Sequence, residues 1–133
     1  MRWMVDTDTC IALIKGHAGA IKRLRGKAIG QVGISAVTLS ELSFGAAKSN
    51  RPDQASAALA EFTLALEVAP FDAETAPVYG GVRAPLAKRG RPIGPLDTLI
   101  GSHALALDVT LVTRNTREFS RIEGLRLEDW IGP

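Results

Sequence analysis

The chain has 133 residues, of which 46% are hydrophobic and 23% charged, and its formal net charge is +2. This length and composition predict one globular domain over residues 1–133, with a core of adequate size and an ordinary charged surface. The single cysteine, Cys10, excludes an internal disulfide. No apolar run approaches the ~20 residues of a membrane span, and no signal peptide is recognisable, so we expect a reducing, cytoplasmic location.

The first predicted element is a short apolar run over residues 3–5 that stops at Asp6. Such a run is typical of a buried central strand in a parallel sheet. In open α/β sheets, ligands bind outside the carboxyl ends of the strands, which places Asp6 where chemistry is expected. A short helix over residues 11–14 follows, capped by Thr7 or Asp8.

A second short helix over about residues 17–25 has a basic outer face, which is either a solvated surface or an edge that contacts phosphate. Residues 32–35 predict a second core strand, and a helix with Glu41 comes next. Thr38 and Glu41 have the spacing of a capping box, which is one interpretation of Glu41. The other is that Glu41, one turn into a helix leaving a strand end, faces the same crevice as Asp6.

Beyond an amphipathic helix that starts at Pro52, residues 67–71 predict a short strand and Asp72 is expected to cap the next helix. A basic connection over residues 88–92 leads to a helix start at Gly94-Pro95. Asp97 lies in the first turn of this helix, where the helix dipole favours a carboxylate. Asp97 is therefore either an ordinary first-turn residue or a third acidic group at the site, and Gly101 is expected to leave its face open to a ligand.

The last core strand is predicted over residues 109–113, and the segment 125–130 is expected to close the sheet as an edge strand. Asn115 and Glu118 follow the core strand at its carboxyl end. Asn115 alone fits a helix cap as well as it fits a ligand.

Taken together, Asp6, Glu41 and Asp97 are three carboxylates that repel one another unless a cation lies among them. Asn115 and Glu118 are candidates to support them. Oxygen ligands without cysteine or histidine suit Mg²⁺ or Mn²⁺ rather than zinc. Such an ion can lower the pKa of a water and orient a phosphodiester. Neither of the two histidines, His17 and His103, is expected to take part in catalysis.

These features resemble a PIN-domain ribonuclease, and specifically a VapC-type toxin of a bacterial type II toxin–antitoxin system. The stretches that carry the resemblance are MVDTDTC (4–10), ISAVTLSEL (34–42), GAAKS (45–49), GRPIGPLD (90–97), VTRNTREF (112–119) and LRLEDW (125–130). The resemblance implies a PIN-like α/β/α sandwich with a central, mostly parallel sheet. It implies Mg²⁺- or Mn²⁺-dependent cleavage of a structured RNA such as a tRNA.

On this resemblance, Asp6, Glu41 and Asp97 occupy the three core acidic positions of the family, as catalytic and metal-binding residues. Asn115 occupies the variable fourth position, with Glu118 one turn further along. The resemblance also implies a homodimer in the bacterial cytoplasm, inhibited by a VapB-type antitoxin that covers the site. Operator DNA would be bound only through that antitoxin, and no membrane is involved.

Two alternatives stay open from the sequence. Asp6 and Asp8 have the spacing of the nucleophile and general acid in haloacid-dehalogenase-type phosphatases. Those enzymes need a lysine and a further acidic pair late in the chain, and here Glu128-Asp129 lies at the very end without the glycine-containing loop around it. The other alternative is a non-catalytic domain that binds RNA or a protein partner, although clustered negative charge disfavours RNA.

Overall fold

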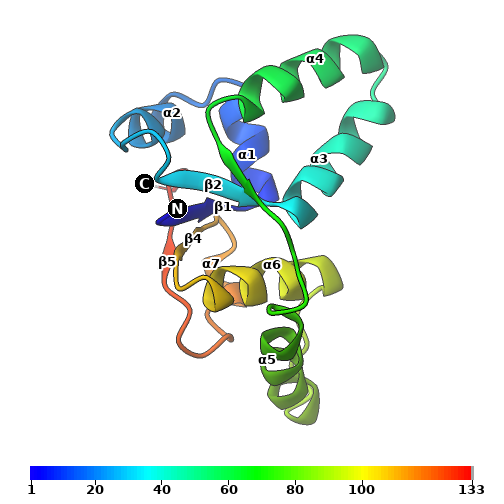
Figure 1. Ribbon diagram of the computed structural model, residues 1–133, viewed down its shortest axis with the longest axis vertical. Coiled ribbons are helices and arrows are strands. Elements are labelled where there is room, and N and C mark those ends of the chain that lie inside the picture. The colour runs from blue at the N-terminus through cyan, green and yellow to red at the C-terminus, as the bar shows by residue number, and fades with distance from the viewer. Residues whose placement is uncertain (133) are drawn as a thin grey trace.

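The computed structural model describes residues 1–132 and shows a five-stranded sheet between two layers of helices (Figure 1). All strand pairings are parallel, in the order β3-β2-β1-β4-β5, which confirms the predicted α/β/α sandwich. The strands are β1 (Trp3–Val5), β2 (Val32–Ser35), β3 (Glu67–Ala69), β4 (Thr110–Val112) and β5 (Leu127–Glu128). The helices are α1 (Thr7–Ile14), α2 (Ala18–Arg25), α3 (Ala36–Ala47), α4 (Pro52–Thr63), α5 (Ala76–Lys88), α6 (Pro95–Ala106) and α7 (Thr116–Phe119). Within residues 1–132, no helix combines the length and the apolar character that crossing a bilayer would take.

Alternating side chains of the central strands divide the core into two layers. Val5 and Val112 pack on one face with α1, α2 and α3, whereas Met4 and Leu111 pack on the other face with α5 and α6. This is the two-residue period of a strand with both faces covered, which explains why the strands are short continuous apolar runs. The ends of β1 and β4, which lead to Asp6 and Thr113, are therefore buried in the middle of the sheet.

The strand order reverses direction at β1. The chain leaves β1 toward β2 and β3, then crosses back to β4, which pairs with the other side of β1. A reversal of this kind opens a crevice between the two strands at their carboxyl ends, and in α/β sheets ligands bind there. In this molecule the crevice lies between Asp6, just past β1, and Thr113, just past β4.

Three expected helix starts are wrong by a few residues. Asp6 itself caps α1 and accepts a hydrogen bond from the backbone N–H of Thr9, so neither of the two residues after it is the cap. Ser35 caps α3 by accepting from Val37, and the capping box expected around Glu41 is absent. In both helices the cap is a buried residue at the end of the preceding strand, because the strand leads straight into the helix.

Asp72 does not cap α5 either. Its carboxylate accepts hydrogen bonds from the backbone of Glu74 and Thr75, which forms a turn one step before the helix. Gly101 also differs from expectation, because a Cβ there would lie 2.5 Å from Cδ1 of Ile122. The small residue lets α6 pack closely on the segment around α7, and it opens no face to a ligand.

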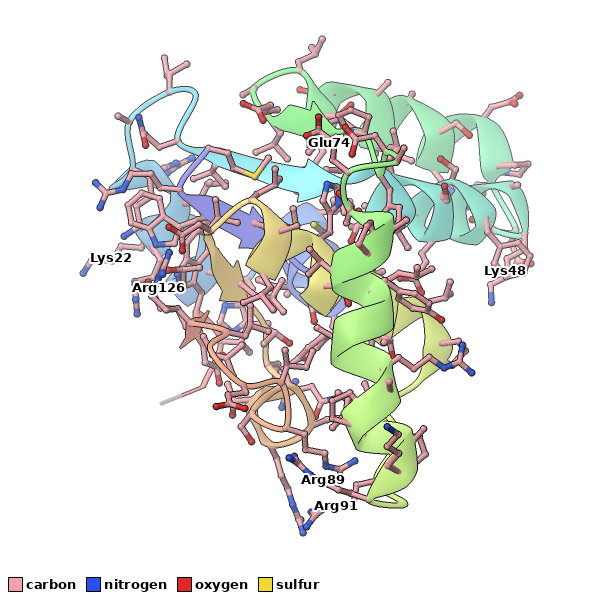
Figure 2. All side chains as sticks on the ribbon, turned by 60° about the horizontal axis from the view of Figure 1, so that its bottom comes forward. Lys22, Lys48, Glu74, Arg89, Arg91 and Arg126 are labelled. Atoms are coloured by element: carbon pink, nitrogen blue, oxygen red, sulfur yellow. The ribbon has the colours of Figure 1, made fainter. Side chains whose placement is uncertain are left out.

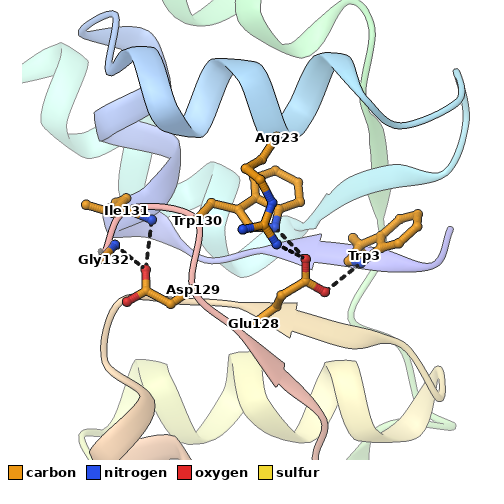
Figure 3. A network of polar contacts seen from close by, with 7 residues as sticks. All are labelled: Trp3, Arg23, Glu128, Asp129, Trp130, Ile131 and Gly132. Atoms are coloured by element: carbon orange, nitrogen blue, oxygen red, sulfur yellow. Dashed lines mark hydrogen bonds and ion pairs between the residues drawn. The ribbon is translucent and has the colours of Figure 1, made fainter.

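The C-terminal segment is held to the sheet by a network around Glu128 (Figure 3). The Glu128 carboxylate accepts hydrogen bonds from the indole N–H groups of Trp3 (3.2 Å) and Trp130 (2.9 Å) and from the Arg23 guanidinium (2.7 Å). Lys27 lies 4.3 Å from the centre of the Trp3 ring. This arrangement, called the Glu128 network below, joins β5 to β1 and α2.

Candidate functional site

The three predicted carboxylates come from three different elements at the same edge of the sheet. Asp6 directly follows β1, Glu41 lies in the second turn of α3, and Asp97 lies in the first turn of α6. Their charges act on one another, because both Asp6 and Glu41 raise the pKa of Asp97. We call these three residues the acidic site.

Asp6 is the most buried member of the acidic site, with 4% of its surface exposed. The hydroxyl of Thr113, 107 residues away in the chain, donates to one Asp6 oxygen at 2.5 Å, and Thr9 N–H donates to the other. Burial raises the pKa of Asp6 from 3.8 to about 6, although these two hydrogen bonds act in the opposite direction. The side chain is therefore held in one orientation at the crevice between β1 and β4.

Glu41 is oriented by a hydroxyl from the neighbouring element. Oγ1 of Thr7 donates to Oε1 of Glu41 at 2.7 Å, and the same hydroxyl lies 3.4 Å from Oγ1 of Thr38. Thr7 follows Asp6 directly, so this bond ties Glu41 on α3 to the end of β1. Of the two interpretations of Glu41, the structure supports the one in which it faces the crevice.

Asp97 is half-buried, and its carboxylate has no hydrogen-bond or ion-pair partner within residues 1–132. Its pKa is raised from 3.8 to about 6, first by burial and then by the charges of Glu118, Asp6, Glu41 and Asp8. Four surrounding carboxylates with no neutralising cation make an ionised Asp97 costly. The first turn of α6 offsets only part of this cost.

Glu118 and Asn115 form a pair at the edge of the acidic site. Oε2 of Glu118 accepts from the Asn115 side-chain amide at 2.9 Å, and Oε1 accepts from the Gly94 N–H at 3.0 Å. These bonds lower the pKa of Glu118. Glu118 thus links the loop after β4 to the start of α6. The side-chain oxygen of Asn115, Oδ1, takes no part in this contact.

No ion pair within residues 1–132 includes a member of the acidic site. No three acidic, histidine or cysteine side chains of those residues stand close enough to enclose a metal ion unaided. Mg²⁺ does not require such a cage, because it commonly binds one or two carboxylates and keeps several waters. An oxygen-only donor set with uncompensated negative charge suits a divalent cation that prefers oxygen ligands, and Asp6, Glu41 and Asp97 are the residues that would hold it.

The sequence interpretation missed the hydroxyls that orient the carboxylates. Thr113 ends the apolar run 109–112, and Thr7 follows Asp6, so both positions were visible as polar residues at strand ends. Their partners were not, because each bond joins segments far apart in the chain. His17 caps α2 through Nδ1, and His103 is fully buried beneath the site.

A parallel α/β sandwich with carboxylates gathered at the strand-order reversal defines a class of acidic-site domains, and comparisons place the chain within it. The PIN domain family model matches residues 3–125. The chain is 42% identical to the tRNA(fMet)-specific endonuclease VapC of Shigella flexneri, with 98% of each chain covered.

Solved structures agree. The chain is similar to a chain of DNA-bound VapBC from Salmonella typhimurium, with a TM-score of 0.92 and 41% identity over 98% of each chain. It is also similar to a chain of VapBC2 from Rickettsia felis bound to a promoter DNA fragment, with a TM-score of 0.91 and 38% identity, covering 98% of this chain and 99% of that one. The protein therefore belongs to the PIN-domain family and, within it, to the VapC proteins.

Proposed function

We propose that the protein is a metal-dependent endoribonuclease toxin that cleaves a structured RNA. The observation that carries the proposal is the acidic site itself, in which three carboxylates from three elements form no ion pair with a cationic side chain of residues 1–132. This site occurs in a chain that belongs to the VapC proteins. Family membership argues against the phosphatase alternative. Asp8 is exposed to solvent in the first turn of α1, whereas Asp6 is buried.

Each member of the acidic site has a distinct part in the proposed mechanism. Hydrogen bonds from Thr113 and Thr9 fix the orientation of Asp6, and a hydrogen bond from Thr7 fixes that of Glu41. Asp97 contributes a carboxylate without a hydrogen-bond partner among residues 1–132. A bound Mg²⁺ or Mn²⁺ would lower the pKa of a water and polarise the scissile phosphodiester. Because Asp6 and Asp97 have pKa values near 6, protons compete with the cation, and metal affinity should rise between pH 5 and 7.

We infer that the substrate is a tRNA. The Shigella flexneri relative and a second relative from Salmonella typhimurium, 42% and 41% identical, are both named tRNA(fMet)-specific endonucleases. We propose the same tRNA for this chain, which implies the bacterial cytoplasm as its place of action.

Exposed basic residues beside α6 are suited to the RNA backbone. The helix α5 ends at Lys88, and two further basic residues, Arg89 and Arg91, lie between it and the start of α6. Arg89 and Arg91 project away from the body of the protein (Figure 2). Arg114 is exposed next to Thr113. Phosphate contacts of this kind supply affinity that depends on salt.

Replacing Lys88, Arg89 and Arg91 together with glutamine should weaken tRNA binding and reduce its salt dependence. Filter binding at several salt concentrations, with the catalytically inactive Asp97→Asn background, measures both quantities. Lys48→Gln, on the exposed end of α3, is the control for loss of charge alone. Binding equal to that of the control would move the RNA path to another surface.

The antitoxin surface that we propose is an apolar groove of about 290 Å³ between α1, α3 and α4. Ile14, 37% exposed, and Leu42 line it, together with Glu41 of the acidic site. An antitoxin segment in this groove would reach the acidic site directly. The solved VapBC relatives, which include DNA-bound complexes, support a VapB partner with operator contacts made through it. We also propose a homodimer, which light scattering would measure.

The decisive experiment is incubation of a labelled total-tRNA pool with antitoxin-free protein in Mg²⁺, in Mn²⁺ and in EDTA. We expect discrete fragments with either metal, none in EDTA, and none from Asp97→Asn purified in the same way. Sequencing the fragments identifies the tRNA and the cut position. Fragments that persist in EDTA, or that Asp97→Asn also produces, would contradict the proposal.

A further inference from the structure

His103 is a polar residue in a place that packing alone would fill with an apolar one. It is on α6, two turns beyond Asp97, and no part of it is exposed. The edge of the Phe71 ring packs against it, with ring centres 5.3 Å apart. A buried polar side chain costs free energy unless it is paired. Nε2 of His103 has no hydrogen-bond partner within residues 1–132, so the pairing of Nδ1 indicates what the residue does.

The partner of His103 is Ser35, 68 residues away in the chain. Nδ1 of His103 lies 2.8 Å from Oγ of Ser35, and Ser35 is also fully buried. The Ser35 oxygen already accepts from the backbone N–H of Val37, so its own hydrogen is available for Nδ1. Burial lowers the pKa of His103, which keeps the imidazole neutral and able to accept.

This hydrogen bond joins two helices that carry members of the acidic site. Ser35 is the N-cap of α3, which carries Glu41, and His103 belongs to α6, which carries Asp97. The two helices cover opposite faces of the sheet and come into contact at its carboxyl edge. Among the hydrogen bonds of residues 1–132, it is the one that connects α6 to α3 or to its cap.

The two helices also repel each other through the site, since the charge of Glu41 raises the pKa of Asp97. A metal site needs its ligands at a set separation, and groups behind the ligands supply that constraint in many proteins. A hydrogen bond has a defined length and direction, whereas an apolar contact at the same place would let the helices slide.

We propose that Ser35 and His103 are a positioning pair that sets the separation of Glu41 and Asp97, and with it the affinity of the acidic site for a divalent cation. This inference rests on the proposed function, because it assumes that the acidic site binds the cation. It assigns the pair no contact with RNA or with the reacting atoms.

The test is Mn²⁺ binding to purified, RNA-free protein, followed by the electron paramagnetic resonance signal of free Mn²⁺. We expect Ser35→Ala and His103→Leu each to weaken binding by about tenfold. His103→Asn, which keeps a hydrogen-bonding atom near the position of Nδ1, should recover much of the loss. The double variant should bind about as weakly as either single variant, because the hydrogen bond between the two side chains is lost in all three cases.

Ser102→Ala is the matched control. Ser102 is equally buried on the same helix, but its hydroxyl bonds to the Thr98 carbonyl within α6, so its loss leaves the α3–α6 connection intact. We expect its Mn²⁺ affinity to stay within twofold of wild type, by the same reasoning. RNA cleavage by Ser35→Ala should return toward the wild-type rate at saturating Mn²⁺, which a general loss of structure would not allow.

The outcomes separate this inference from the proposed function. If wild-type protein binds no Mn²⁺, the proposed function fails first. If the wild type binds Mn²⁺ and both Ser35→Ala and His103→Leu bind it with wild-type affinity, the proposed positioning role is wrong, whatever the melting temperatures of the variants. If His103→Leu fails to fold, the other two variants still test the proposal. We then expect Ser35→Ala to lose Mn²⁺ affinity and His103→Asn to keep most of it.

Discussion

The acidic site and the Glu128 network surround their carboxylates with opposite kinds of neighbours. Glu128 accepts hydrogen bonds from two indoles and a guanidinium, and its pKa is lowered by these partners although burial acts against them. Asp6 and Asp97 have pKa values raised to about 6, and no cationic side chain of residues 1–132 pairs with them.

The difference separates a carboxylate that stabilises structure from one that awaits a ligand. The protein supplies its own cations and donors to Glu128, so that group needs nothing from outside. It supplies hydroxyls and other carboxylates to the acidic site, which orient the oxygens without neutralising them. Charge left uncompensated at a conformationally fixed site lowers stability and is typical of functional sites.

The largest expected effect comes from breaking the acidic site at Asp97. Asp97→Asn should lower RNA cleavage by at least about a hundredfold, because a charged ligand is lost. The same change should raise the free energy of unfolding of the metal-free protein by about 1–2 kcal/mol at pH 7, because it removes a repelled charge. Urea denaturation in EDTA measures this gain.

Saturating Mn²⁺ should reverse that order of stability, since the cation binds the folded wild type and stabilises it by mass action. A variant that is less stable than wild type in EDTA would show that Asp97 is a structural residue and would remove the contrast with Glu128.

The converse substitution is Glu128→Ala. It leaves the indole N–H groups of Trp3 and Trp130 without an acceptor, and we expect a loss of about 2–3 kcal/mol in the free energy of unfolding. RNA cleavage at a temperature well below melting should be unchanged. Glu123→Ala, at an exposed position, is the control. A stability equal to that of the control would mean that the network contributes nothing.

How far these features could be predicted from sequence differs between the two regions. Asp6 and Asp97 were predicted because each follows a short-range pattern, an apolar run that stops or a Gly-Pro helix start. The trio of strands around β1 was predicted for the same reason. Ser35 and His103 were missed, because their bond joins residues whose neighbours show no shared pattern.

Helix caps were the weakest predictions. The choice among Asp6, Thr7 and Asp8, all chemically able to cap, depends on where β1 ends, and that depends on its pairing with β4. Gly101 was misread for a similar reason, because its neighbour Ile122 comes from a distant segment. Local chemistry identified the polar groups of the site, whereas tertiary packing decided their partners.

The dependence of the free energy of unfolding on pH should reveal the raised pKa of Asp97. An acid whose pKa is raised by folding binds protons more tightly in the folded state, so its contribution to stability is greatest below pH 4 and falls as the pH rises through 6. The stability difference between Asp97→Asn and wild type in EDTA should thus grow by about 1–2 kcal/mol between pH 4 and 7. A difference that is constant with pH would contradict the raised pKa.

The smallest expected effect concerns Lys27, which faces the rings of Trp3 at 4.3 Å and Trp130 at 5.9 Å. Lys27→Met keeps the apolar stem and removes the charge, which should lower the free energy of unfolding by about 0.5–1 kcal/mol. Lys22→Met, exposed on α2, is the control. Equal melting temperatures for the two variants would exclude a cation–π contribution.

The position of β1 also has a consequence for the order of synthesis. β1 lies in the middle of the finished sheet, whereas the Thr113 hydroxyl that orients Asp6 comes 107 residues later in the chain, just past the neighbouring strand β4. Domains fold as units once their segments are available, and contacts over such a separation form late. A nascent chain that has not yet reached Thr113 therefore carries Asp6 without the hydroxyl that orients it, and the acidic site is complete only after β4 has been made.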